Sequence, residues 1–245
     1  MRVAEPSPRE LAPAFPSGQY ESLRRMAEAE NYNAWMLERA TPYLGQAVLD
    51  VGAGTGTFTA ALADGRERVV GLEPDPPLFE ILDRRLGGRP NVEVFQAESG
   101  QLRSLLPDAR FDSIVCFNVL EHIADETAAL RGFHESLRAG GHLLLLVPAH
   151  PLLFGQIDRT VGHERRYRKR SLRTSLHGMG FDVVELRYVN PVGALGWLVS
   201  SRILKREHVP EGPLKLYDRL VPALRALDRF DVGFGLSLWA VARRR

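Results

Sequence analysis

Val48-Leu-Asp-Val-Gly-Ala-Gly-Thr-Gly56 is the stretch of sequence that decides the fold. Its first four residues are typical of a short strand buried on both faces, as in a parallel sheet covered by helices. Gly52, Gly54 and Gly56 then form a turn with almost no side chains, so backbone amides can lie directly against a small ligand. A helix is predicted from Phe58 onward. Strand, glycine loop and helix in this order predict an α/β fold with a ligand-binding loop.

The spacing of the glycines indicates which ligand the loop binds. The dinucleotide fingerprint Gly-x-Gly-x-x-Gly has its last glycine where the helix begins beneath a pyrophosphate. Here Thr57 occupies that position and the third glycine comes one residue early, so a ligand without phosphates fits better. The segment resembles the first motif of the class I S-adenosylmethionine (SAM)-dependent methyltransferases. The resemblance implies a cofactor loop made of Asp50, Gly52, Ala53, Gly54 and Gly56.

A second acidic residue at the end of an apolar run supports this resemblance. Arg68-Val-Val-Gly-Leu-Glu73 is followed by Pro74. A carboxylate at the tip of the second strand can accept hydrogen bonds from both ribose hydroxyls of a nucleoside. The resemblance assigns that role to Glu73. It further implies that SAM, and its product S-adenosylhomocysteine (SAH), contact Pro74, Glu98, Ser99, Asn118 and Val119.

Apolar runs alternate with helical patterns along the chain, which predicts a doubly wound parallel sheet. By resemblance the sheet is a seven-stranded Rossmann-like methyltransferase sheet in the order 3-2-1-4-5-7-6, with the last strand antiparallel. A helix over Asp125–Ala139 is expected to end at Gly140-Gly141. The expected organisation is a tail at 1–18 and a single methyltransferase domain at 19–245. Within that domain, a helical lid is predicted at 19–43 and a helical insert at 191–230. The expected strands are 47–51, 68–73, 92–96, 111–117, 142–147, 181–189 and 234–243.

The segment after the fifth strand contains Gly162-His-Glu-Arg-Arg-Tyr167. Open α/β sheets place ligand crevices at the carboxyl ends of their strands. The segment looks like one found in a group of bacterial small-molecule methyltransferases. His163 is the preferred candidate for a catalytic base because the ordinary pKa of histidine is near 6.5. Tyr167 is the second candidate, and Arg166 is expected to bind a polar or anionic group of the substrate.

Other aromatic and histidine residues complete the predicted site. Asn31-Tyr-Asn-Ala-Trp35 resembles a lead-in segment of the same methyltransferase group. Tyr32 and Trp35 are therefore expected to bind substrate from the lid. His122 follows the fourth strand and is expected to face either the cleft or the packed helix behind it. No metal ion is expected.

The predicted function is SAM-dependent methyl transfer to an O, N or C nucleophile of a small molecule, such as a secondary metabolite. A base is required only if the acceptor must lose a proton. Two alternatives remain open. A nicotinamide-dependent oxidoreductase would need the glycine spacing that Thr57 breaks. A non-catalytic SAM-binding module would be expected to carry a damaged cofactor site.

Composition agrees with a compact enzyme. The 245 residues are 44% hydrophobic and carry a net charge of +2, which gives no strong field toward nucleic acid. The single Cys116 lies in a predicted buried strand, so a cytoplasmic setting is expected. No apolar stretch reaches the roughly 20 residues that a membrane span needs. The sequence leaves the oligomeric state and the acceptor open.

Overall fold

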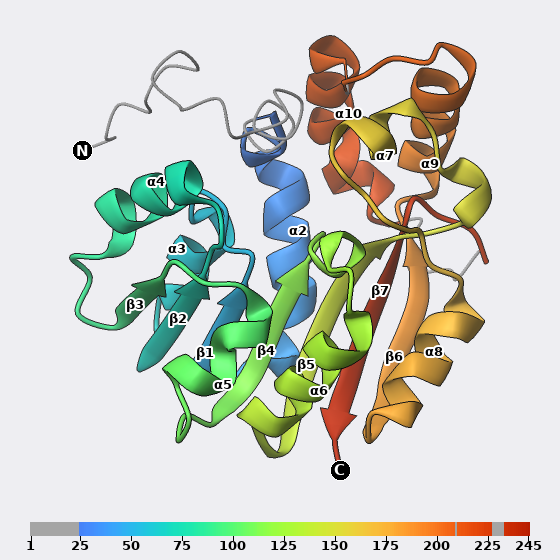
Figure 1. Ribbon diagram of the computed structural model, residues 1–245. Coiled ribbons are helices and arrows are strands. Elements are labelled where there is room, and N and C mark those ends of the chain that lie inside the picture. The colour runs from blue at the N-terminus through green and yellow to red at the C-terminus, as the bar shows by residue number, and fades with distance from the viewer. Residues whose placement is uncertain (1–24, 209, 227–232) are drawn as a thin grey trace.

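The computed structural model describes residues 25–208, 210–226 and 233–245, which form a seven-stranded sheet covered by helices (Figure 1). The strand order is β3-β2-β1-β4-β5-β7-β6, with β7 antiparallel to both of its neighbours. The other pairs are parallel. The predicted fold is therefore confirmed. The strands are β1 Ala47–Val51, β2 Arg68–Leu72, β3 Val92–Phe95, β4 Phe111–Phe117, β5 Leu137–Pro148, β6 Phe181–Val189 and β7 Ser237–Arg244.

Helices cover both faces of the sheet and divide the core into two layers. One buried cluster joins the sheet to α5, α6 and α8. The other joins it to α2, α3, α4 and α10. The helices are α2 Glu30–Ala40, α3 Thr57–Ala63, α4 Pro76–Leu86, α5 Leu102–Leu105, α6 Glu126–Ser136, α7 Gln156–Thr160, α8 Lys169–Gly178, α9 Pro191–Trp197 and α10 Glu211–Leu224. Shorter helical turns are η1 Thr41–Tyr43, η2 Ser99–Gln101, η3 Leu120–His122, η4 Pro151–Leu153 and the π-helical η5 Leu198–Ile203.

The predicted end of the helix before β5 was wrong. α6 ends at Ser136, and Leu137 already pairs with Phe111 of β4. Gly140 has a φ of +77°, and a Cβ on Gly141 would lie 2.9 Å from a backbone oxygen of β4. The two glycines therefore form an irregularity inside a long β5, and the fully buried Leu137 pairs in the sheet before it.

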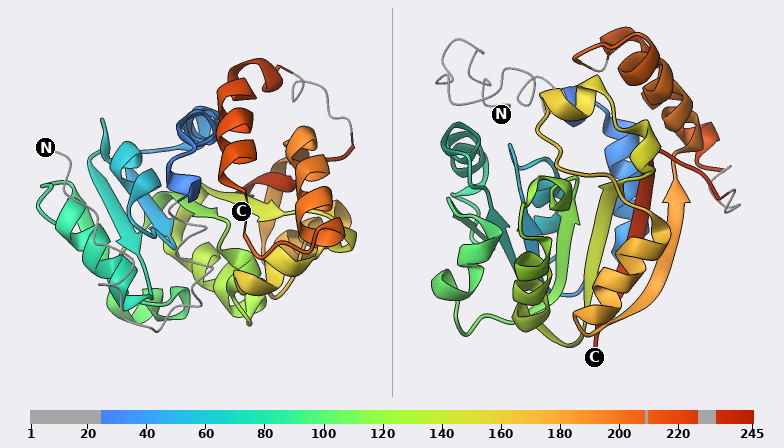
Figure 2. Two further views of the ribbon diagram at one scale, coloured as in Figure 1. Left: turned by 90° about the horizontal axis from the view of Figure 1, so that it is seen from above. Right: turned by 45° about the vertical axis from the view of Figure 1, so that its right-hand side comes forward.

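The helical insert lies at the carboxyl end of the sheet, where α9, η5 and α10 gather above β5, β6 and β7 (Figures 1 and 2). Helix α2 begins near the same end. The carboxylate of Asp218 on α10 accepts hydrogen bonds from the Tyr32 amide at 2.9 Å and from both nitrogens of Asn31, at 3.3 and 3.1 Å. Asp218 thereby satisfies orphan amides at the start of α2. The predicted tail at 1–18, the first residues of the predicted lid and 227–230 of the predicted insert lie outside the described residues.

Candidate functional site

The glycine loop after β1 has a backbone that favours glycine at three positions. Gly52, Gly54 and Gly56 have φ of +70°, +56° and +83°. The amides of Gly52 and Ala53 both donate to the Leu72 carbonyl, at 2.8 and 2.9 Å, and so fasten the loop to β2. A Cβ on Gly52 would lie 2.3 Å from Val119, whereas a Cβ on Gly54 would meet nothing within 4 Å. The loop is thus packed closely at Gly52 and open at Gly54.

Two buried carboxyl groups lie on either side of this loop. Glu73, at the tip of β2, accepts hydrogen bonds from the Gly54 amide at 2.7 Å and the Asp75 amide at 3.0 Å. Asp50 accepts one from the Thr59 hydroxyl at 2.6 Å. Burial raises the pKa of each carboxyl to about 7. Glu73 therefore holds the loop directly through the Gly54 amide, whereas Asp50 ties β1 to α3, the helix that follows the loop.

The other predicted cofactor residues follow the ends of neighbouring strands. Pro74 is exposed next to Glu73. The backbone of Glu73 pairs with Phe95 and Ala97, which brings the exposed Glu98 and the half-buried Ser99 to the same edge. Asn118 has a φ of +53° and donates its amide to Leu146 at 2.7 Å. The structure brings the glycine loop, Glu73 and Val119 together at the carboxyl edge of β1, β2 and β4.

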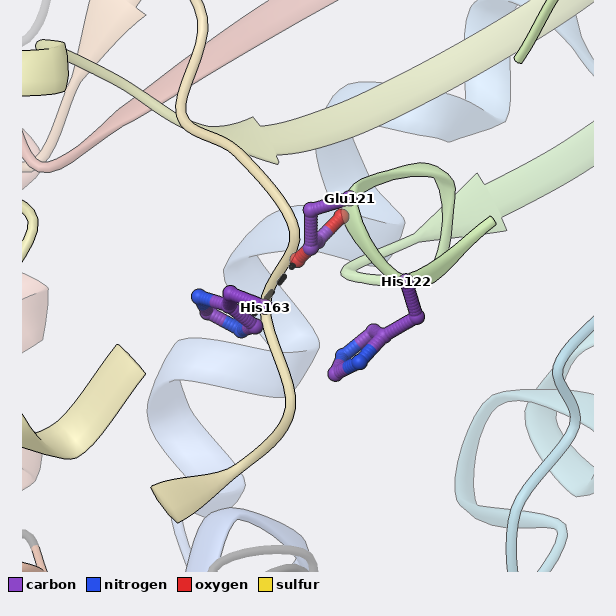
Figure 3. Close-up of side chains that lie close together, drawn as sticks. All are labelled: Glu121, His122 and His163. Atoms are coloured by element: carbon purple, nitrogen blue, oxygen red, sulfur yellow. Dashed lines mark ion pairs between the residues drawn. The ribbon is translucent and has the colours of Figure 1, made fainter. Parts of the chain in front are cut away.

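A cluster of one carboxylate and two imidazoles lies beyond β4 (Figure 3). Glu121 and His122 come from η3, and His163 comes from the loop between α7 and α8. Two hydrogen bonds hold that loop against η3: the Glu164 amide donates to the Glu121 carbonyl at 2.9 Å, and Nδ1 of His122 pairs with the Gly162 carbonyl at 3.1 Å. The two imidazole rings meet edge to face at 4.8 Å.

The polar groups of this cluster are poorly paired. Glu121 is 0% exposed, and neither of its carboxylate oxygens has a hydrogen-bond partner. Nε2 of His163 lies 3.8 Å from Oε1 of Glu121. Burial raises the pKa of Glu121 to about 8. Burial, together with the neighbouring His163, lowers the pKa of His122 to about 4, so that imidazole is neutral near pH 7.

Asp158, at the third residue of α7, fixes the orientation of His163. The Asp158 carboxylate is fully buried and pairs with Nδ1 of His163 at 2.8 Å and Nε of Arg166 at 2.7 Å. It also accepts hydrogen bonds from the Gly155 amide at 2.8 Å and from Trp197 at 3.3 Å. Although burial opposes ionisation, these partners bring the pKa of Asp158 below its usual value. Because Nδ1 of His163 faces Asp158, Nε2 faces Glu121.

Two residues of the predicted catalytic segment have other partners. The side chain of Arg166 is 1% exposed, binds Asp158 and the Ala149 carbonyl, and lies 4.7 Å over the Trp197 ring. It is a buried counter-ion, not an exposed substrate anchor. The Tyr167 hydroxyl donates to Glu126 at 3.0 Å, and burial raises the pKa of Tyr167 far above the range of a base. These contacts do not support the expected roles of Arg166 and Tyr167, and both roles stay predictions.

Tyr32 and Trp35 also differ from the prediction. Both rings are buried between α2, α10 and the sheet, and they meet edge to face at 5.9 Å. Tyr32 further contacts Tyr217 of α10 at 6.4 Å. In this structure the two rings pack one helix against another, and their expected contact with substrate stays a prediction. Packing accounts for their buried positions.

Sequence reasoning missed Glu121 and Asp158. Glu121 directly precedes His122, and Asp158 begins the segment that leads to His163. Each is an acid near a histidine that had been singled out, which is the signal that could have identified them. Neither Glu121 nor Asp158 lies at a regular helical or strand spacing from His163, because their contacts with His163 form between loops.

Comparison with known proteins agrees with this geometry. Residues 49–143 match a family model described as a methyltransferase domain. The ubiquinone biosynthesis O-methyltransferase of Pseudomonas paraeruginosa (strain DSM 24068 / PA7) is 31% identical over 112 residues, which cover 45% of this chain and 47% of that protein. An uncharacterized methyltransferase of Mycobacterium leprae (strain Br4923) is 33% identical over 109 residues, or 44% of this chain and 39% of the relative. The chain thus spans less than half the length of these relatives.

Solved structures share the fold. The N-methyltransferase NodS from Bradyrhizobium japonicum WM9, in complex with SAH, superposes with a TM-score of 0.59 at 15% identity, covering 88% of this chain and 86% of that one. Among the described residues, no helix is both long and apolar enough to cross a membrane. The family match over residues 49–143, together with the strand order and the glycine loop with its acids, identifies this part of the chain as a methyltransferase domain of the class I SAM-dependent type.

Proposed function

We propose that this chain transfers the methyl group of SAM to a small-molecule acceptor. The observation that carries the proposal is the buried Glu73 carboxylate, which lies at the tip of β2 and is hydrogen-bonded to Gly54 of the glycine loop. A carboxylate in this position can accept the ribose hydroxyls of a nucleoside. The loop beside it offers backbone and open space rather than side chains.

The residues present fit SAM. The open side of Gly54 leaves room for a ligand where another residue would place a Cβ. Glu73 would hold the ribose, the Gly52–Gly56 backbone would lie along the methionine part, and Asn118 and Val119 would border the reacting end. Bound SAM supplies a methyl group that its sulfonium sulfur has already activated. The protein then has mainly to align the acceptor, which can contribute roughly 7–11 kcal/mol.

An apolar surface supports a small organic acceptor. Leu195, Val199 and Ile203 are 59%, 46% and 65% exposed and follow one another at helical spacing in α9 and η5. These elements lie at the carboxyl end of the sheet (Figure 2). We propose that the insert, together with the start of α2, forms a lid over this end. The relatives named as O- and N-methyltransferases agree with a small acceptor but do not fix the atom methylated.

His163 is the residue we propose to face the acceptor. Asp158 engages its Nδ1, so its Nε2 is left facing Glu121. His122 offers a second imidazole within the same cluster. A nitrogen held in this way can accept a proton from the acceptor or coordinate a cation. The unpaired carboxylate of Glu121 favours the second of these roles.

Calorimetric titration of SAH and of NADH into the purified chain tests the function. We expect SAH to bind and NADH not to bind. Binding of NADH would instead favour a nicotinamide-dependent oxidoreductase. Glu73→Gln should weaken SAH binding by about 1.5–3 kcal/mol, the usual range for hydrogen bonds to a charged group. Glu80→Gln is the matched control, because Glu80 is exposed on α4. Equal SAH affinity in the two variants would contradict the assignment. Binding without methyl transfer to any phenol, amine or carbon acid tested would instead favour a SAM-binding module.

A further inference from the structure

We infer that Glu121, His122 and His163 form a binding site for one divalent ion of the first transition row. Their ligand atoms lie within 4.8 Å of one another (Figure 3). The set was not foreseen from the sequence, because His163 comes from a different loop than the other two. Two imidazoles and one carboxylate suit ions such as Mn²⁺, Fe²⁺, Co²⁺ and Zn²⁺ and leave further coordination positions open.

The unpaired carboxylate of Glu121 is the first independent observation. The side chain is fully buried, and both oxygens lack a hydrogen-bond partner. Burying a carboxyl group without partners is costly, and such a group in a native fold calls for a physical reason. A cation bound between Glu121 and the two imidazoles would supply the missing partner.

The orientation of the two imidazoles is the second observation. Nδ1 of His163 pairs with Asp158 at 2.8 Å, and Nδ1 of His122 pairs with the Gly162 carbonyl at 3.1 Å. Histidine ligands of metal ions commonly engage a carboxylate or a backbone carbonyl through their other ring nitrogen. Both rings therefore have Nε2 available for an ion. Arg166 binds the same Asp158 oxygen at 2.7 Å and so helps to hold that carboxylate in place against His163.

The distances require only a small contraction. Ligand atoms at about 2.1 Å from one ion lie about 3.0–3.4 Å apart in octahedral or tetrahedral geometry. Nε2 of His163 and Oε1 of Glu121 are 3.8 Å apart. The three side chains would have to turn toward one another to bring all their ligand atoms, now within 4.8 Å, to that spacing. The His122 and His163 rings are only partly buried, which leaves a side from which the ion can enter.

The open coordination positions would take water or oxygen atoms of the acceptor. This last role rests on the proposed function, whereas ion binding itself does not. A coordinated acceptor hydroxyl would lose its proton to solvent water near neutral pH, because a bound divalent ion lowers the pKa of such oxygens. The acceptor class that this implies is a compound with a hydroxyl, or a pair of adjacent oxygens, at the atom to be methylated.

Titration of metal-stripped full-length chain with Co²⁺, followed by visible absorption and calorimetry, tests the site. We expect one Co²⁺ per chain and displacement by Zn²⁺. Glu121→Gln and His163→Gln should each weaken Co²⁺ binding by on the order of 100-fold or more, since even loss of an outer-shell partner costs roughly 10–100-fold. His177→Gln, which removes an exposed histidine of α8, should leave it unchanged.

SAH titration of the same variants separates the two proposals. Glu121→Gln should retain SAH binding, and that binding would also show that the variant is folded. If Glu121→Gln does not fold, His122→Gln provides a second variant that removes a ligand of the ion. Absence of Co²⁺ binding, or equal Co²⁺ affinity in the wild type and the ligand variants, would overturn the metal site. A failure to bind Co²⁺ would not contradict the SAM site, which the SAH titration of Glu73→Gln tests separately. Likewise, a failure to bind SAH would not contradict the metal site.

Discussion

The two halves of the carboxyl edge are built in different ways. Around β1 and β2 the site is mostly backbone: a glycine loop, its amides and one carboxylate that holds them. Beyond β4 and β5 it is made of side chains from separate loops, joined through Glu121, His163 and Asp158. The first half follows from local sequence, whereas the second depends on which loops pack together. The difference teaches that a local motif predicts backbone geometry such as the glycine loop, whereas contacts between side chains of separate loops depend on tertiary packing.

The largest effect expected is on stability, from Arg166→Met in the side-chain half. This change leaves the buried Asp158 without its counter-ion. Breaking a buried pair from one side costs about 3–5 kcal/mol. Chemical denaturation of the variant measures that loss. Lys215→Met is the control, because Lys215 forms an exposed pair with Glu211 on α10 and should cost under about 1 kcal/mol. An Arg166→Met variant of wild-type stability would return this residue to the role of substrate anchor.

The backbone half is tested by Gly54→Ala. The added methyl has room in the fold but would occupy space proposed for the cofactor, so SAH affinity should fall by about tenfold or more. Gly65→Ala is matched to it, since Gly65 also has positive φ and open space around a Cβ. Both variants should lose roughly 1–2 kcal/mol of stability through backbone strain. Only Gly54→Ala should lose SAH affinity, and an equal effect of both on calorimetric titration would contradict the proposed place of the cofactor.

The pH dependence of SAH binding is a smaller effect on the same half. Glu73 has a pKa of about 7 in the folded chain. In the proposed site its ionised form would accept the ribose hydroxyls. SAH affinity should therefore rise with pH up to about 7, by at most about tenfold per unit, and level off above it. Calorimetry between pH 5 and 8 measures this slope, which should vanish in Glu73→Gln. An unchanged slope in that variant would mean that another group controls binding.

Stability of the chain without SAH should change in the opposite direction. The folded-state pKa values of Asp50 and Glu73, both about 7, lie above their unfolded values near 4. Their contribution to stability is fully present below pH 4 and is lost as pH rises through 7. Thermal unfolding of Glu73→Gln against wild type over this range isolates the share that belongs to Glu73.

The smallest effect expected is that of Tyr167→Phe. Its hydroxyl bonds Glu126, which also lies 3.8 Å from Arg165, so the loss should be about 1–2 kcal/mol of stability. Affinities for SAH and Co²⁺ should stay at wild-type values. A large fall in methyl transfer, with stability intact, would restore Tyr167 to the reacting centre.

The sequence predicted the sheet closely because each strand carries its own signal. The predicted bounds of β1, β4 and β6 agree with the structure, since apolar runs end at glycine, proline or polar residues. The helix stop at Gly140 failed because Leu137 finds a partner in Phe111, which local pattern cannot show. In the site, Glu73 was identifiable from its place after a strand. The partners of Arg166 and Tyr167 could not be identified from the sequence, because tertiary packing sets the direction of a side chain in a loop.

A crystal structure of the chain with bound SAH tests the central claim most directly. We expect both ribose hydroxyls within hydrogen-bond distance of the Glu73 carboxylate, with the methionine part along Gly52–Gly56. We also expect the sulfur on the side of Val119 that faces the His122 and His163 cluster. SAH bound away from the glycine loop, or with its ribose held by a residue other than Glu73, would contradict it.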